Sequence, residues 1–121
     1  TDFQKNAYSF LPQFDTFVVT SEREGGPSSL VEALYYKAPI VSTRVGVVDE
    51  VIEDGVNGYS VPIKSPGLMA EKILKIKKNP ALKTQFADKS YKIFLQKFTA
   101  ERYGEATFAV YKDMMQKELR R

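Results

Sequence analysis

One stretch of the chain, residues 21–34, combines glycine, proline, serine and glutamate in an order that could bind a ligand. Its sequence is S-E-R-E-G-G-P-S-S-L-V-E-A-L. Gly25 and Gly26 would let a ligand approach the backbone closely, because they carry no side chain. Pro27 sets the φ angle of a first helical turn without removing a needed donor. The stretch is therefore typical of a loop that leads into a helix and holds an anionic group at the N-terminus of that helix.

The polar side chains of this stretch suit a ligand that carries both hydroxyl groups and phosphates. Ser28 and Ser29 can donate hydrogen bonds from the backbone and from the side chain. Glu24 and Glu32 lie eight residues apart, and we expect both carboxylates to face the same crevice. A carboxylate binds paired sugar hydroxyls well, since it accepts two hydrogen bonds at once. Together these residues favour a nucleotide sugar as the ligand.

A simpler explanation of the same residues is structural. Ser29 and Glu32 have the spacing of a capping box, in which Ser29 caps the helix and Glu32 accepts a hydrogen bond from an N-terminal amide. Two glutamates at this spacing also occur often by chance, and a glycine-proline loop is more often a plain turn than a binding site. Taken alone, the glutamate pair favours this structural explanation.

The residue types and motifs that the sequence lacks narrow the chemistry further. It has no cysteine and no histidine, which excludes disulfides, thiolate metal ligands and the commonest general base near neutral pH. It contains no G-x-G-x-x-G, P-loop or D-x-D pattern. A second acidic group has the spacing of helix-start and turn residues rather than of metal ligands: Asp49, Glu50, Glu53 and Asp54. We therefore expect no metal ion and no cofactor, with chemistry from carboxylates, hydroxyls, basic groups and backbone amides.

The elements that must position these residues alternate between strands and helices. We predict a short helix at 5–13, strands at 16–20, 40–43 and 59–62, helices at 30–37 and 48–54, and a turn at 55–58. The strand at 16–20 is β-branched and aromatic, which is typical of a strand buried on both faces. The strand at 40–43 resembles a second buried strand, and 59–62 is a third strand. Strands joined by helices pair in parallel with right-handed crossovers, and ligands bind at their carboxyl ends. The fold class is therefore α/β, with a partial Rossmann-like parallel sheet of about three strands and helices on its faces.

The second half of the chain is predicted to be helical. Apolar residues recur at helical spacing after Pro66, after Pro80 and over 99–119, where a threonine in the first position is the expected N-cap. The first two helices carry one apolar stripe each. The third carries a wider apolar surface with Phe108 and Met115, which is typical of a core face and could instead be a surface for a partner domain.

Length, composition and charge are those of an ordinary globular domain. The chain has 121 residues, of which 43% are hydrophobic and 27% charged. We find no apolar run long enough for a membrane span and no signal peptide. Residues 1–60 carry a net charge of −5 and residues 61–121 a net charge of +8. A basic half can bind nucleic acid, anionic lipid or an acidic partner, but lysine-rich solvated helices are the simpler explanation, and we expect no nucleic-acid partner.

Several motifs in register resemble one enzyme family. The segments are E-G-G-P-S-S-L-V-E (24–32), A-L-Y-Y-K-A-P-I-V-S-T-R-V-G (33–46) and E-V-I-E-D-G-V-N-G-Y-S-V-P (50–62). They are similar to the C-terminal half of the nucleotide-binding domain of family 4 retaining glycosyltransferases (glycosyltransferase group 1), which have the GT-B fold. The shared features are the E-x7-E pair, Pro39, Thr43 with Gly46, Glu50 and the D-G-x-N-G turn. This combination outweighs the structural explanation, although Glu32 can serve both roles.

The resemblance implies a role for each residue of the loop. It implies that Glu24 lies beside the donor sugar and its reacting carbon as the catalytic residue, and that Glu32 holds the ribose hydroxyls. It implies that the loop offers backbone amides to the sugar and the diphosphate; its members are Gly25, Gly26, Pro27, Ser28 and Ser29. The implied enzyme is of the hexosyltransferase type. It transfers a sugar from a nucleotide sugar to a glycan or lipid acceptor with retention and without a metal ion, since amides can stabilise the departing diphosphate.

The chain departs from the family pattern in ways that leave the donor open and indicate a fragment. Val47 stands where a glycine is usual, and Tyr35 and Tyr36 stand where small residues are common. The acceptor-binding N-terminal domain and the early strands of the C-terminal domain are absent, and the chain does not begin with methionine. We therefore expect a single partial domain, 1–121, that is inactive alone and self-associates through its sheet edge and last helix. Its parts are the α/β part at 1–65, with the donor site, and the helices at 66–121.

Two functions from other classes stay open. A nucleotide-sugar epimerase shares the GT-B architecture, but the whole set of motifs is not expected in one. A non-catalytic α/β interaction module, such as a receiver domain, would need an acidic cluster after its first strand and a lysine late in the sheet, and we find neither arrangement. The resemblance also implies a role in polysaccharide biosynthesis in the cytoplasm. The basic half could then make a peripheral contact with the inner face of a membrane.

Overall fold

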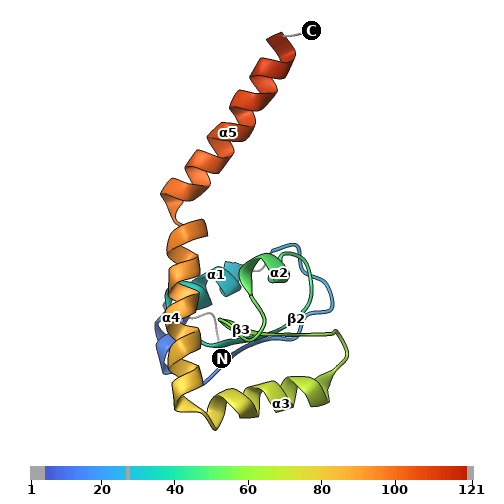
Figure 1. Ribbon diagram of the computed structural model, residues 1–121, viewed down its shortest axis with the longest axis vertical. Helices are drawn as coiled ribbons and strands as arrows, with labels where there is room; N and C mark the ends of the chain where they lie inside the picture. Colours follow the sequence, from blue (N-terminus) through green and yellow to red (C-terminus); the bar gives the residue numbers. More distant parts are fainter. Residues whose placement is uncertain (1–4, 27, 120–121) are drawn as a thin grey trace.

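Three parallel strands form the sheet at the centre of the fold. The computed structural model describes residues 5–26 and 28–119. The strands β1 (Phe17–Val19), β2 (Ile40–Thr43) and β3 (Gly58–Val61) lie in the order β1-β2-β3. The register pairs Val18 with Val41 and Val41 with Tyr59. This parallel sheet with its helices confirms the predicted α/β class (Figure 1).

Helices cover the sheet and continue beyond it. In the described residues they are η1, a 3-10 helix (Ala7–Gln13), α1 (Ser28–Tyr35), α2 (Val48–Val51), α3 (Pro66–Lys77), α4 (Pro80–Lys97) and α5 (Ala100–Leu119). In Figure 1, α1 and α2 lie on one side of the sheet and α3 on the other, and α4 contacts both α1 and α3. The Thr99 hydroxyl accepts a hydrogen bond from the Arg102 amide at 3.3 Å. The predicted N-cap of the last helix is therefore confirmed.

The hydrophobic core is divided between the two faces of the sheet, because neighbouring residues of a strand point in opposite directions. On one face, Ile40 packs in a cluster with Leu34 of α1 and Val48 of α2. On the other face, Val41 packs in a cluster with residues of β3, α3 and α4, namely Tyr59, Val61, Met69, Ile76 and Phe86. The central strand β2 is thus buried along its whole length, as its apolar sequence predicts.

Helix α2 is shorter than the predicted 48–54 and ends at Val51. The fully buried side chain of Asn57 accounts for this end. Its Oδ1 accepts a hydrogen bond from the Glu53 amide at 2.7 Å, and its Nδ2 donates to the Val51 carbonyl at 3.0 Å. The side chain therefore takes backbone groups that a longer helix would use, and the chain turns at Gly55, whose φ is +77°, into β3.

Strand β1 lies at an edge of the sheet, and the prediction that it is buried on both faces is wrong. Every residue of β2 and β3 is buried. In β1 only Val19 is buried, and Val18 is 38% exposed. Among the described residues β1 and β3 each have a neighbouring strand on one side only, but β3 also packs against α3. Burial therefore depends on which edge of the sheet a helix covers.

Helix α5 extends away from the rest of the fold (Figure 1). All of its side chains from Ala100 to Glu118 are exposed, including Phe108 at 70% and Met115 at 66%. The interpretation of this apolar surface as a core face is therefore wrong within this chain. Neither α5 nor any other described helix combines the length and apolar content needed to cross a membrane.

Candidate functional site

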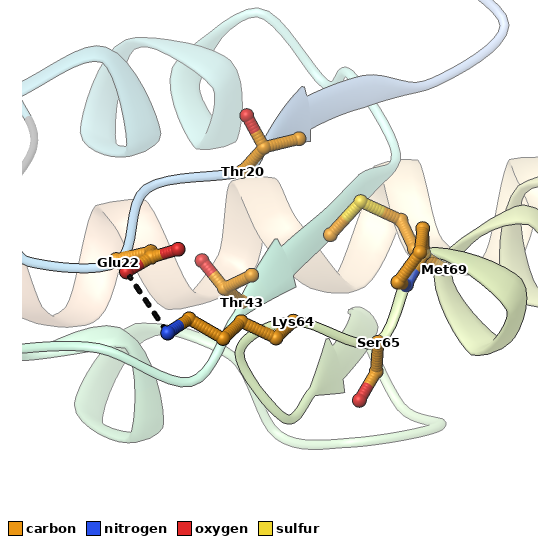
Figure 2. Close-up of a pocket in the computed structure, with 7 residues that line it drawn as sticks. Thr20, Glu22, Thr43, Lys64, Ser65 and Met69 are labelled. Carbon is orange, nitrogen blue, oxygen red and sulfur yellow. Dashed lines mark ion pairs between the residues drawn. The ribbon is translucent and has the colours of Figure 1, made fainter.

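Three loops meet at the carboxyl-terminal edge of the sheet, where parallel strands end together. They contain residues 20–26, 44–47 and 62–65. A cavity of about 160 Å³ lies at this edge and is lined by Thr20, Glu22, Thr43, Lys64, Ser65, Pro66 and Met69. Figure 2 shows the Lys64 ammonium approaching Glu22 across it, with Nζ 3.8 Å from Oε2. Because both side chains are largely exposed, this ion pair contributes little to stability.

A buried hydroxyl ties the loop after β1 to β2. Thr43, which is 4% exposed, donates from Oγ1 to the carbonyl oxygen of Ser21 at 2.6 Å. Ser21 in turn donates from Oγ to Oε1 of the Glu24 carboxylate at 2.8 Å. Two hydrogen bonds in series therefore connect Glu24 to the sheet.

Gly46 brings the loop after β2 into contact with the loop after β1. Its φ of +53° lies in the left-handed region that favours glycine. A Cβ atom at this position would overlap the carbonyl oxygen of Glu24. Both the backbone conformation and the close approach thus require glycine, and Gly46 helps to place the backbone that carries Glu24.

The predicted ligand loop leads directly into α1, as expected from the sequence. The structure exposes Glu24, Gly25, Gly26 and Ser28 and half-buries Ser29, while Pro27 lies outside the described residues. Helix α1 begins at Ser28, so Ser29 is its second residue rather than the N-cap, and the capping-box interpretation is wrong on that point. The first amides of a helix have no partner inside it. This end of α1 is therefore suited to an anionic group.

Glu32 lies on α1 beside apolar surface. It lines a cavity of about 270 Å³ together with the aromatic residues Tyr8, Tyr35, Tyr36 and Phe94 and with Val31. It also lines a second cavity of about 430 Å³ with Ser29 and apolar residues of η1 and β1. Glu24 is not among the lining residues of either cavity. Glu32 therefore lies beside apolar hollows that Glu24 does not line.

The aromatic residues beside Glu32 form a packed set of rings. Tyr8 stacks on Tyr36 with ring centroids 5.7 Å apart, and Tyr35 meets Tyr36 edge to face at 4.8 Å. Burial, and next the neighbouring Tyr8, raise the pKa of the Tyr36 hydroxyl above its ordinary value. The sequence marks Tyr35 and Tyr36 as departures from the family pattern. It does not mark Tyr8, because that residue comes from η1 and meets α1 only in the folded chain.

The acidic group at 49–54 has structural partners. Asp49 lies 3.3 Å from Nε of Arg44, and Asp54 accepts a hydrogen bond from the Ser60 amide at 2.9 Å. Across residues 5–26 and 28–119, no three or more histidine, cysteine, aspartate or glutamate side chains form a group that could hold a metal ion. These contacts agree with the interpretation of the acidic group as helix and turn residues.

The sequence matches a known family over most of its length. Residues 1–93 match the model described as glycosyl transferases group 1. A glycosyltransferase of Methanocaldococcus jannaschii is 31% identical over 106 residues, which are 88% of this chain and 30% of that protein. A poly(ribitol-phosphate) alpha-N-acetylglucosaminyltransferase of Staphylococcus aureus is 33% identical over 92 residues, which are 75% of this chain and 19% of that protein. The chain thus spans about a third or less of the length of the curated relatives it matches.

Solved structures show the same fold. TarM of S. aureus superposes with a TM-score of 0.80 at 30% identity, covering 90% of this chain and 22% of TarM. Anabaena HepE, solved with UDP, superposes with a TM-score of 0.85 over 92% of this chain and 31% of HepE. HepE is 20% identical, so its likeness bears on the fold alone. From the family match and these superpositions, the chain belongs to the group 1 glycosyltransferases of the GT-B fold.

Proposed function

We propose that this chain is the donor-binding part of a family 4 retaining glycosyltransferase. The observation that carries the proposal is the loop at residues 21–26, which is fastened to β2 at the carboxyl edge of the sheet and leads into α1. A nucleotide sugar lies along this edge, with its diphosphate at the N-terminus of α1. There, unpartnered amides and the helix dipole stabilise negative charge.

Each residue of the loop has a role in this proposal. Glu24 lies beside the donor sugar and its reacting carbon as the catalytic carboxylate. Glu32, on the next turn of α1, accepts hydrogen bonds from the two ribose hydroxyls. The backbone amides between them, at Gly25, Gly26, Ser28 and Ser29, donate to the sugar hydroxyls and the diphosphate. Five of these six residues are exposed and Ser29 is half-buried, so a ligand can reach them.

The proposed reaction exchanges one bond at the sugar carbon. The bond from C1 to the diphosphate oxygen breaks, and the acceptor oxygen bonds to C1 on the same face and gives its proton to the departing diphosphate. Negative charge grows on the departing diphosphate, where preoriented amides stabilise it without a metal ion. Positive charge grows on C1, where the Glu24 carboxylate stabilises it.

Named relatives support a role in building surface polysaccharide. TarM, at 31% identity, has been solved with UDP and alpha-GlcNAc-glycerol. Other relatives are named for lipopolysaccharide core and O-antigen biosynthesis. We propose that this chain uses a hexose donor in the cytoplasm and that a glycan or lipid acceptor is bound by parts of the protein outside the matched third. The chain alone would then bind donor without transferring it.

Replacing Glu32 tests the donor site directly. Glu32→Ala is expected to weaken binding of UDP or GDP, and of their hexose conjugates, by about tenfold or more, since hydrogen bonds to a charged acceptor contribute about 1.5 to 3 kcal/mol. Ligand-observed NMR titration of the 121-residue chain measures the dissociation constants. Whichever base binds more tightly identifies the nucleotide.

A matched control separates this site from general charge effects. Glu101→Ala removes an exposed glutamate from the first turn of α5, far along the chain from α1, and should leave the dissociation constants unchanged. Equal binding by Glu32→Ala and the unaltered chain would place the ligand elsewhere. Absence of binding to every probe at millimolar concentration would contradict donor binding by this chain.

A further inference from the structure

We infer that Thr43 is a positioning residue for the Glu24 carboxylate and acts on it through Ser21. The inference rests on the proposed function, because Glu24 is the carboxylate that the proposal places beside the donor sugar. Thr43 stands at the end of β2, and Ser21 and Glu24 belong to the loop after β1. The coupling therefore runs from the buried central strand to an exposed catalytic group.

The Thr43 hydroxyl adds a contact between β2 and the loop after β1, beyond the last backbone pair of the two strands. That ladder ends where Val19 pairs with Ser42. Two residues beyond Val19, the carbonyl of Ser21 receives the Thr43 hydroxyl at 2.6 Å. Because Thr43 is 4% exposed, water does not readily take the place of its hydroxyl, and a carbonyl left without this partner would be costly. The side chain of Thr43 thus fixes where the loop begins.

Ser21 connects the fixed start of the loop to the Glu24 carboxylate. Its Oγ donates to Glu24 Oε1 at 2.8 Å, and a hydrogen bond to a charged acceptor is stronger than one between neutral groups. A free glutamate side chain on a loop samples many rotamers, and ordering it opposes binding. Holding one carboxylate oxygen of Glu24 before the donor arrives removes part of that cost.

The backbone of Glu24 is placed from the same side. Its carbonyl oxygen lies so close to Gly46 that no Cβ would fit there. Residues 43–46 therefore locate both the carboxylate and the main chain of Glu24. The Ser21–Glu24 hydrogen bond is itself exposed, as is the Glu22–Lys64 ion pair across the same loop, whose charged atoms are 3.8 Å apart and which salt screens. The buried contact that fixes the loop is therefore that of the Thr43 hydroxyl.

Two substitutions at Thr43 separate the hydroxyl from the shape of the side chain. Thr43→Val keeps the branched shape and removes the hydroxyl, whereas Thr43→Ser keeps the hydroxyl. The carboxyl carbon resonance of Glu24, assigned by NMR in the ligand-free chain, is expected to shift in Ser21→Ala and to shift in the same direction in Thr43→Val. In Thr43→Ser it should stay near its original position. Thr84→Val is the control, because the Thr84 hydroxyl bonds only within α4, to the Pro80 carbonyl at 3.1 Å.

Binding measurements then test whether loss of the Thr43 hydroxyl also weakens binding of the donor. Thr43→Val is expected to weaken binding of a UDP- or GDP-hexose about three- to tenfold, the usual effect of one hydrogen bond. The dissociation constant of UDP or GDP without the sugar should change by no more than about twofold. Thr43→Ser should restore binding of the hexose conjugate. In a Glu24→Gln background, Thr43→Val should have no further effect, since coupled residues do not act additively.

Three results would overturn the inference. They are a Glu24 resonance that Thr43→Val leaves in place, a Thr43→Ser variant that behaves like Thr43→Val, and a loss of affinity that persists in the Glu24→Gln background. If the unaltered chain binds no nucleotide probe, the proposed function fails. The carboxyl resonance then decides the positioning role by itself, because it requires no ligand.

Discussion

Gly46→Ala is expected to lower the free energy of unfolding by about 2 to 5 kcal/mol. A left-handed φ of +53° costs a residue with a Cβ about 1 to 2 kcal/mol. Overpacking against the Glu24 carbonyl adds about 1 to 3 kcal/mol as the two loops move apart. The same movement displaces Glu24, so we also expect weaker binding of nucleotide sugars. Urea denaturation followed by far-ultraviolet circular dichroism measures the stability.

Two further variants separate the causes of this loss. Gly46→Asn keeps the overlap with Glu24 but tolerates the left-handed conformation better, so its loss should be smaller than that of Gly46→Ala. Gly67→Ala serves as the control, because a Cβ there meets no atom within 4 Å and α3 gains a better helix former. A Gly46→Ala chain as stable as the Gly67→Ala chain would contradict the close approach of the two loops.

Phe86→Ala is expected to lower the free energy of unfolding by about 3 to 5 kcal/mol, the usual cost of truncating a buried phenylalanine. Phe86 is fully buried in α4. Its ring meets that of Tyr59 edge to face at a centroid distance of 5.2 Å. It also belongs to the cluster of Val41, Met69 and Ile76, which joins α3 and α4 to the sheet. The cavity left by alanine therefore loosens both helices at once.

The size of this effect is measured against an exposed phenylalanine. Phe108→Ala removes the same side chain from α5, where Phe108 is 70% exposed, and should change the free energy of unfolding by no more than about 0.5 kcal/mol. Thermal and urea denaturation of both variants provide the comparison. Similar losses in the two variants would show that α4 is not packed on the sheet as described.

The positions of β2 and β3 could be predicted from their own residues. The predicted strand at 40–43 coincides with β2, and the one at 59–62 differs from β3 by one residue at each end. Both strands are short, and both are buried along their whole length. The strand at 16–20 is equally short, yet β1 is partly exposed, although β3 is also an edge strand. Which edge a helix covers, as α3 covers β3, is not encoded in the composition of any one strand.

The residues at which the helices end depend on tertiary contacts that the local sequence pattern does not show. The end of α2 is determined by the buried amide of Asn57, six residues beyond Val51. The sequence places Asn57 in a turn but does not show that its side chain reaches back to the helix. Similarly, Lys37 ends α1 in a left-handed conformation, with φ +58°, which lysine seldom adopts. Such ends require the tertiary structure.

The position of the loop in the candidate site could be predicted from the sequence, but the hydrogen bonds that hold it could not. The composition of residues 21–34 indicates a ligand loop before a helix, and the structure places it there. The contact between Thr43 and Ser21 spans 22 residues and depends on the register of β1 and β2. The apolar hollows beside Glu32 likewise depend on how η1 packs against α1. Neither property is visible in residue spacing alone.

Helix α5 makes the chain thermodynamically heterogeneous. With its side chains exposed, its helical state depends on local interactions, such as the surface pairs Arg102–Glu105 and Asp113–Lys117, and Gly104 lowers its intrinsic propensity. Most helical stability in proteins comes from packing of an apolar face, which the exposed side chains of α5 lack within this chain. The helix therefore follows a helix–coil equilibrium of its own. It frays gradually and exchanges its amide hydrogens early, while the sheet and its packed helices unfold as one cooperative unit.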